Sequence, residues 1–256
     1  MPEPDLDLLL SAATEAAAIA CRHWRQNPKV WEKGIDGPVS EADYEVDAFL
    51  RTTLRSARPD YGWLSEETPD EPGQRAASRV FVVDPIDGTR AFIGGEPTWA
   101  HSLAVVEDGR PITAVVHLPV RKKTYAAALG RGATLNGATV RASDRPEVAG
   151  STFLAARASF EPQHWKGAVP QVDRAFRPSL AYRLALVAEG RFDGMLTLRP
   201  TWEWDVAAGA LIASEAGATV TDRCGRPLVF NNADPRLDGV LVAGPKLHAD
   251  VTARMA

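Results

Sequence analysis

Two carboxylates three residues apart are the feature of this sequence that points most directly to chemistry. Asp84 and Asp87 lie in the segment Val-Val-Asp-Pro-Ile-Asp-Gly-Thr, which ends at Thr89 and follows a short apolar run. An apolar run of this length between turn residues predicts a buried strand. Pro85 disfavours helical backbone at the residue before it, so we expect Asp84 to project from the end of that strand.

An anion site is expected directly beside these carboxylates. Gly88 permits close approach of the backbone, and the amides of Gly88 and Thr89 would point outward at the start of a helix. Carboxylates and an anion repel each other unless hard cations lie between them, and oxygen-only ligands of this kind suit Mg²⁺. The plainer interpretation is a helix cap and an Asp-Gly turn without a ligand.

Two other acidic segments strengthen the metal interpretation. Glu66 and Glu67 end an apolar stretch that begins at Trp63, and Asp205 directly precedes a helix rich in alanine and glycine. Each segment also has a plainer interpretation. Adjacent glutamates suit a solvated loop, and an acidic residue suits the start of a helix.

The elements that must position these residues differ between the two halves of the chain. In the first half, the periodicity predicts helices over 6–25 and 40–56 and strands over 79–83, 102–107, 112–118 and 123–129. Short turns between the last three strands indicate an antiparallel sheet, and residues 68–77 suit an exposed loop. In the second half, strands are expected over 152–156, 193–198 and 240–243, with helices over 179–189 and 206–216. We therefore predict an N-terminal α+β lobe over 1–140 with the metal and phosphate site, which a C-terminal α/β lobe over 141–256 completes.

Composition excludes several classes of protein. The 256 residues include 45% apolar and 24% charged residues, the balance of a globular protein rather than a disordered or coiled-coil chain. A net charge of −4 argues against binding to nucleic acid polymers or anionic membranes. Cys21 and Cys224 form no metal-type pattern and suit a reducing compartment. We find neither a signal peptide pattern nor an apolar run of ~20 residues, so the cytoplasm is the expected location.

Taken in chain order, these segments resemble the inositol monophosphatase family of Mg²⁺-dependent, lithium-sensitive phosphatases. That family carries a Glu-Glu pair, an Asp-Pro-(Ile/Leu)-Asp-Gly-Thr segment and a Trp-Asp-x-Ala-(Ala/Gly)-Gly segment, the last of which begins here at Trp204. A fourth element also matches, because Lys33 lies ten residues before Asp43 with Pro-Val-Ser between them. The resemblance spans nearly the whole chain and implies an α+β fold, a layered αβαβα sandwich of the sugar-phosphatase type.

The resemblance implies a set of metal ligands. Glu66, Asp84 and the main-chain carbonyl of Ile86 would hold one Mg²⁺ ion. Asp84, Asp87 and Asp205 would hold a second, and Glu66 would also help to place a water molecule or a third, weaker ion. The implied chemistry is an in-line displacement in which one ion lowers the pKa of the attacking water and the other stabilises the leaving alkoxide.

The resemblance also implies roles around the phosphate. The amides of Gly88 and Thr89 would cradle it, and Asp205 would contact the substrate. Asp43 would accept a hydrogen bond from the Thr89 hydroxyl. Thr89 and Glu66 would together orient the attacking water.

The substrate is less clearly indicated. Inositol-type members bind the sugar hydroxyls through a glutamate in the strand before the Trp-Asp motif, whereas residues 195–198 here read Met-Leu-Thr-Leu. Several segments resemble the bacterial 3′(2′),5′-bisphosphate nucleotidases instead, which remove the 3′-phosphate of adenosine 3′,5′-bisphosphate. By that resemblance Arg183 would meet the second phosphate, although an ordinary arginine on a helix surface is the alternative. Trp202 or Tyr182 could stack on an adenine, or either could be a core aromatic residue.

These observations leave three functions open. The first is a 3′(2′),5′-bisphosphate nucleotidase, and the second is an inositol-1-monophosphatase or another sugar or histidinol phosphatase. The third, of another class, is a protein-binding role in a transcription complex, which some members of the family have. All of Glu66, Asp84, Asp87 and Asp205 are present, which argues against a purely non-enzymatic role. The expected partner is a small phosphorylated substrate, and a homodimer is compatible with the sequence.

Overall fold

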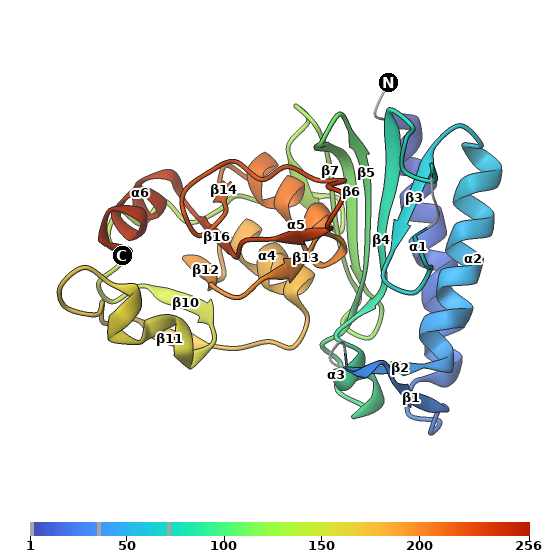
Figure 1. The fold of residues 1–256 in the computed structure, drawn as a ribbon, viewed down its shortest axis with the longest axis horizontal. Coiled ribbons are helices and arrows are strands. Elements are labelled where there is room, and N and C mark those ends of the chain that lie inside the picture. Colours follow the sequence, from blue (N-terminus) through green and yellow to red (C-terminus); the bar gives the residue numbers. More distant parts are fainter. Residues whose placement is uncertain (1–2, 35–36, 71–72) are drawn as a thin grey trace.

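The elements of this protein stack in five layers, as the computed structural model of residues 3–34, 37–70 and 73–256 shows (Figure 1). The first layer holds helices α1 (Glu3–His23) and α2 (Glu41–Ala57). A seven-stranded sheet, the helices α4 (Leu180–Ala188) and α5 (Glu203–Glu215), a five-stranded sheet and helix α6 (Pro245–Arg254) follow in that order. The αβαβα sandwich expected from the sequence is thereby confirmed.

The seven-stranded sheet carries the first part of the motif. Its order is β3 (Gly62–Ser65), β4 (Arg79–Asp87), β5 (Ala100–Glu107), β6 (Arg110–Leu118), β7 (Lys123–Ala128), β8 (Ala133–Leu135) and β9 (Ala138–Thr139). Strands β3 and β4 are parallel and every other neighbouring pair is antiparallel. Strand β4 extends to Asp87, beyond the predicted end at residue 83, with a register shift between Asp84 and Asp87. The shift spans Pro85, which has no N–H to donate to a neighbouring strand.

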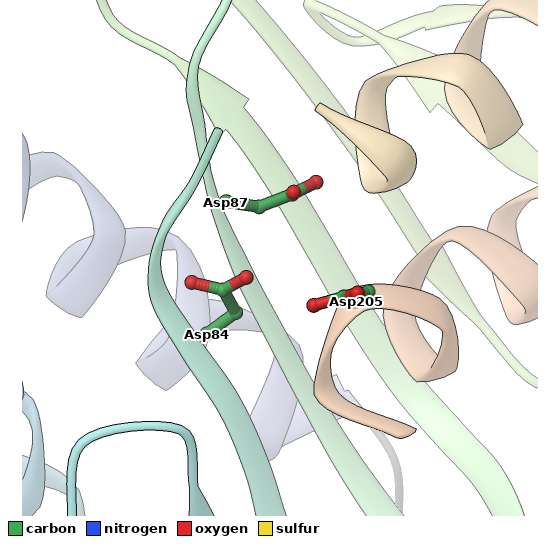
Figure 2. Close-up of side chains that lie close together, drawn as sticks. All are labelled: Asp84, Asp87 and Asp205. Carbon is green, nitrogen blue, oxygen red and sulfur yellow. The ribbon is translucent and has the colours of Figure 1, made fainter. Parts of the chain in front are cut away.

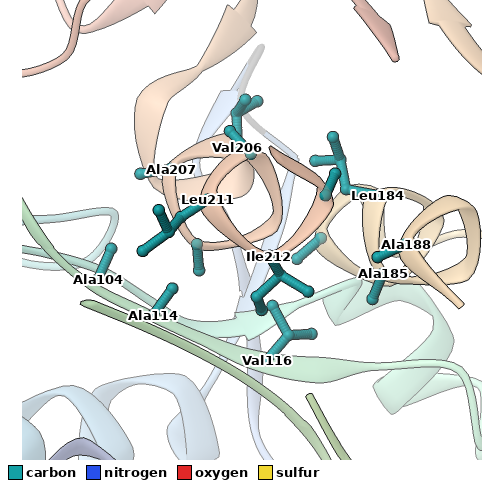
Figure 3. Packing of buried hydrophobic residues seen from close by; sticks show 14 of the residues in the cluster. Ala104, Ala114, Val116, Leu184, Ala185, Ala188, Val206, Ala207, Leu211 and Ile212 are labelled. Carbon is teal, nitrogen blue, oxygen red and sulfur yellow. The ribbon is translucent and has the colours of Figure 1, made fainter. Parts of the chain in front are cut away.

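Strand β4 is buried on both faces, which explains its unbroken apolar sequence. Val80 and Val82 belong to the core between the sheet and the helices α4 and α5. Phe81 and Val83 belong to the core beneath α1 and α2. Figure 3 shows the first of these cores, where residues of α4 and α5 pack on small side chains of strands β5 and β6. Because alternate residues of a strand point to opposite faces, one apolar run serves both cores.

The five-stranded sheet is built from the second half of the chain. Its order is β11 (Asp173–Ala175), β10 (Thr152–Ala155), β12 (Gly194–Thr197), β16 (Val240–Ala243) and β14 (Thr219–Thr221). Strand β10 is parallel to both of its neighbours, and β16 is antiparallel to both of its own. Two small two-stranded sheets join β1 (Val30–Glu32) to β2 (Pro38–Ser40) and β13 (Thr201–Trp202) to β15 (Arg236–Leu237).

Most of the elements expected from the sequence are present, with shifted ends. Helix α5 begins at Glu203, earlier than the predicted helix over 206–216, and helix α6 was not predicted. Residues 71–72 of the predicted exposed loop over 68–77 lie outside the described residues. Thr68 at its start is not exposed, because it is buried and donates a hydrogen bond to Asp47.

The division into lobes at residues 140 and 141 stays a prediction. The two large sheets come from separate parts of the chain, but helix α5 packs on strands of both. Across the described ranges, no helix has the length and apolar character needed to cross a lipid bilayer.

Candidate active site

Three carboxylates from the two halves of the chain meet at one end of strand β4. Asp84 and Asp87 come from β4, and Asp205 comes from the first turn of α5. Figure 2 shows the three side chains turned toward a common space. Each offers an oxygen atom, and these atoms lie within 4.8 Å of one another. Asp205 lies in the first turn of α5, as expected of an acidic residue at a helix start, although the capping position itself is Trp202.

Hydrogen bonds hold these carboxylates in place. The amide of Ile86 donates to Oδ1 of Asp84 at 2.9 Å. Oδ2 of Asp87 accepts from the Ser179 hydroxyl at 2.7 Å and from the Ala181 amide at 2.6 Å. These bonds orient the carboxylates of Asp84 and Asp87 at the end of β4.

The proximity of its oxygen atoms would allow this cluster to hold a cation. Burial raises the pKa of Asp84 and of Asp205 well above the ordinary value, and the neighbouring carboxylates raise both further. Burial also raises the pKa of Asp87 to about 6, although its hydrogen bonds act in the opposite direction. Buried carboxylates at this spacing need a compensating positive charge when they are ionised. A donor set made only of oxygen atoms fits Mg²⁺.

The glutamate pair lies beside this cluster and shares one lysine. The ammonium of Lys33 lies 3.0 Å from Oε1 of Glu66 and 2.8 Å from Oε1 of Glu67. The Glu67 side chain is 2% exposed, so the interpretation of the pair as a solvated loop is wrong. Burial, and then the charge of Glu66, raise the pKa of Glu67 to about 7. Glu66 lines the same cavity as the aspartates but stands outside their cluster.

Thr89 connects the cluster to helix α2. Its hydroxyl lies 3.2 Å from Oδ1 of Asp43 and 3.1 Å from the Ile86 carbonyl. Oδ2 of Asp43 accepts from the amide and hydroxyl of Ser40 at 2.9 and 2.6 Å, which fixes the first turn of α2. Burial raises the pKa of Asp43 to about 6. The contact that was expected between Thr89 and Asp43 is therefore present, whereas the role of Thr89 in catalysis stays a prediction.

Gly88 allows the turn between the carboxylates and Thr89. Its φ is 97°, in the left-handed region that residues with a Cβ rarely adopt. A Cβ here would also lie 3.3 Å from the Thr98 carbonyl oxygen. The following helix α3 (Thr89–Ile93) has only five residues. Gly88 and Thr89 both line the cavity, as a phosphate cradle requires.

A cavity of about 740 Å³ opens over these residues. Sequence reasoning did not single out Phe176 or Arg199, which also line it. Thr197 at the end of β12 and Leu198 directly after it line the cavity without a carboxylate, in agreement with the missing sugar-binding glutamate. Arg90 directly follows the Asp-Gly-Thr segment, whereas no motif marked Arg199, because an isolated arginine carries no sequence signal of its own.

Arg183 lies in this cavity and is not an ordinary surface arginine. It is 5% exposed, its guanidinium donates to the carbonyls of Arg177 and Pro178, and it lies 4.1 Å from the centre of the Phe176 ring. Burial lowers its pKa to about 10. Tyr182 is 1% exposed and belongs to the core, so the interpretation that it stacks on an adenine is wrong. Trp202 lines the cavity with its ring stacked on that of Trp204.

The pKa values predict how metal and pH together affect stability. The pKa values of Asp43, Glu67 and Asp87 are higher in the fold than in the unfolded chain, so the protonated carboxyl groups stabilise the metal-free fold below pH 4. This contribution to stability is lost as pH rises through 6 to 7. Mg²⁺ binds the ionised carboxylates and competes with protons. We therefore expect Mg²⁺ to raise the Tm at about pH 7.5 and to change the Tm little at about pH 4.5. At 100 times its Kd, Mg²⁺ should add ~2.7 kcal/mol to the free energy of unfolding at the higher pH.

Thermal unfolding with and without Mg²⁺ at both pH values measures this effect. Asp84→Asn is the control, since it removes one charge from the cluster and should shrink the Mg²⁺-dependent rise in Tm. An equal rise in Tm at both pH values would show that Mg²⁺ binds elsewhere.

Comparisons with known proteins find relatives that match most of this chain. A profile described as the inositol monophosphatase family matches residues 1–255. The chain is 36% identical over 237 residues to a Rhizobium meliloti protein named inositol-1-monophosphatase, covering 87% of this chain and 88% of that one. It is 32% identical over 266 residues to Escherichia coli Nus factor SuhB, covering 98% and 96% of the two chains. A solved IMPase from Thermotoga maritima superposes with a TM-score of 0.82 at 28% identity, covering 99% of this chain and 96% of that one.

Proposed function

Because this chain belongs to the inositol monophosphatase family, we propose that it is a Mg²⁺-dependent hydrolase of phosphomonoesters. The observation that carries the proposal is the convergence of Asp84, Asp87 and the half-buried Asp205 from two distant segments in the lining of one cavity. Bound Mg²⁺ would supply Lewis acidity, which activates water and stabilises charge on the leaving oxygen. The experiment that tests the proposal is the measurement of inorganic phosphate released from phosphomonoesters in the presence of Mg²⁺.

The proposed ligands are the oxygen atoms of the aspartate cluster and of its neighbours. Asp84, Asp87 and Asp205 would hold the metal, and the Ile86 carbonyl and Glu66 would complete the set. The number of carboxylates suits two bound Mg²⁺ ions, with a third ion bound more weakly beside Glu66. The Lys33 ammonium would hold Glu66 in place, since its Nζ lies 3.0 Å from Oε1 of that carboxylate.

The chain's own groups would position the phosphate and the water. Gly88 and Thr89 present backbone amides to the phosphate, and Asp43 orients the Thr89 hydroxyl. That hydroxyl has a single proton, which it donates to Asp43 or to the Ile86 carbonyl. Its lone pairs are then directed to accept a hydrogen bond from the attacking water.

Thr89→Ala should therefore lower kcat by roughly 10²–10⁴-fold, the range for removal of a group that handles a proton or orients water. The Kd for Mg²⁺ should change little, because Thr89 is not a proposed metal ligand. Steady-state kinetics and calorimetric Mg²⁺ titration measure the two quantities, and Thr89→Ser, which keeps the hydroxyl, is the matched control. Equal losses of Mg²⁺ binding and kcat in Thr89→Ala would move Thr89 into the metal shell.

For the substrate, we propose a 3′(2′),5′-bisphosphate nucleotide. The support is the chemistry of the cavity, where Leu198 stands near the position of the sugar-binding glutamate and Arg90, Arg183 and Arg199 contribute positive charge. An arginine suits a second phosphate better than it suits the hydroxyls of inositol. Inositol 1-phosphate is the alternative, because relatives of this chain are named inositol-1-monophosphatase.

We expect a far higher kcat/KM for adenosine 3′,5′-bisphosphate than for inositol 1-phosphate. The second phosphate and the base supply binding energy remote from the reacting phosphate, and this energy can position the reacting group. Phosphate release from both esters under identical Mg²⁺ concentrations measures the ratio. A higher kcat/KM for inositol 1-phosphate would replace the nucleotidase assignment with an inositol phosphatase.

A binding role in transcription is a second candidate. It rests on the relatives named Nus factor SuhB, of which the Escherichia coli protein matches nearly the whole chain. The two roles are compatible, since the metal carboxylates are all present in this chain.

A further inference from the structure

The three arginines that line the cavity differ in the contacts that their side chains make within the protein. The Arg90 guanidinium lies against Gly37, so close that a Cβ on Gly37 would be 2.7 Å from its Nη2. Arg183 is buried and anchored by backbone carbonyls and by the Phe176 ring. Arg199 is exposed, and within the described part of the chain it has neither an ion pair nor a hydrogen bond from its side chain.

Position separates Arg199 from Arg90 as well. Arg90 lies on helix α3, next to the amides of Gly88 and Thr89 that are proposed to bind the reacting phosphate. Arg199 follows strand β12, in the other half of the layered fold (Figure 1). A molecule whose reacting phosphate lies at α3 would meet Arg199 with its remote part.

Arg199 lines the same cavity as Arg183 and the three aspartates. The planar guanidinium of an arginine presents paired N–H donors that match the oxygens of a phosphate. A substrate whose reacting phosphate lies beside the aspartates would present a second anion to these arginines.

Apolar side chains also line this cavity. Leu198 precedes Arg199 in the chain, and Phe176 is 50% exposed although it packs on Arg183. An exposed aromatic ring in a cavity offers a face to a planar or apolar group. The walls therefore suit a ligand with a flat body and a second anion, rather than a polyhydroxylated ring alone.

We propose that Arg199 is a specificity-determining residue that binds a second phosphate of the substrate through its guanidinium. This inference rests on the proposed function and deepens it, since it assigns the recognition of the second phosphate to a residue outside the family motifs. Arg183 acts here mainly by holding Phe176 in place and by adding positive charge.

The test compares two nucleotides that differ only in the second phosphate, adenosine 3′,5′-bisphosphate and adenosine 3′-monophosphate. The wild-type protein should have the higher kcat/KM for the bisphosphate. Arg199→Gln should lower the ratio of the two kcat/KM values roughly 10- to 100-fold, the size of a charge-assisted hydrogen bond. Arg199→Lys should keep part of the ratio. Arg110→Gln is the control, because Arg110 is exposed and does not line the cavity.

Calorimetric binding of the same nucleotides provides a readout that does not depend on turnover. In the Asp84→Asn background, addition of Arg199→Gln should weaken binding of the bisphosphate more than binding of the monophosphate. The inference is overturned if the ratio stays unchanged in Arg199→Gln in both experiments, or if the second phosphate gives the wild type no advantage. Absence of phosphate release from every ester would instead overturn the proposed function, and the binding measurement would still decide the role of Arg199.

Discussion

Asp84→Asn should lower kcat by at least about a thousandfold, the largest loss expected from any single substitution. Asp84 is 1% exposed, and it is proposed to ligate both metal ions. An amide of the same shape removes one negative charge from the place where two dications would lie close together, and in a buried site that charge has a strong effect. The measurement is phosphate release at saturating substrate and Mg²⁺.

The fold of this variant is expected to survive. Ionisation of Asp84 is unfavourable in the metal-free protein, so its neutralisation relieves repulsion among the buried carboxylates. Asp222→Asn is a matched control, since Asp222 is also buried but accepts hydrogen bonds in a turn that does not line the cavity. An Asp84→Asn protein that folds normally and keeps a tenth of the activity would show that Asp84 is only structural.

Removal of Mg²⁺ should abolish hydrolysis, and its return should restore it. Water alone is a poor nucleophile toward a phosphate dianion, and the carboxylates of the site repel that dianion unless a cation lies between them. Exhaustive EDTA treatment followed by assay, and then by addition of Mg²⁺, measures the effect. Circular dichroism of the treated protein is the control for folding. Activity that survives complete chelation would exclude metal-dependent catalysis in this protein.

Local sequence patterns drew attention to the three aspartates that meet in the structure. Asp84 and Asp87 could be placed because an apolar run ends at them, and Asp205 because a helix rich in alanine follows it. Such signals are local, since they depend only on the periodicity of neighbouring residues. The meeting of these segments in space was supplied by the resemblance of the ordered motifs to a known family, not by periodicity.

Contacts between distant segments could not be predicted in the same way. Ser179 was expected to begin a helix, but its hydrogen bond to Asp87 joins residues 92 positions apart. The burial of Arg183 likewise depends on Phe176 and on the walls of the cavity. Helix α6 was not predicted, although Pro245 stands at its first position, where proline favours the start of a helix.

Phosphate release from a panel of esters tests the central claim most directly. The panel should include adenosine 3′,5′-bisphosphate, inositol 1-phosphate and histidinol phosphate, each with purified wild-type protein and Asp84→Asn in the presence of Mg²⁺. We predict that the wild type releases phosphate from at least one ester, the bisphosphate fastest, and that Asp84→Asn is at least about a thousandfold slower. If a folded, Mg²⁺-loaded wild-type protein released no phosphate from any of these esters, the account of this cavity as a phosphatase site would be contradicted.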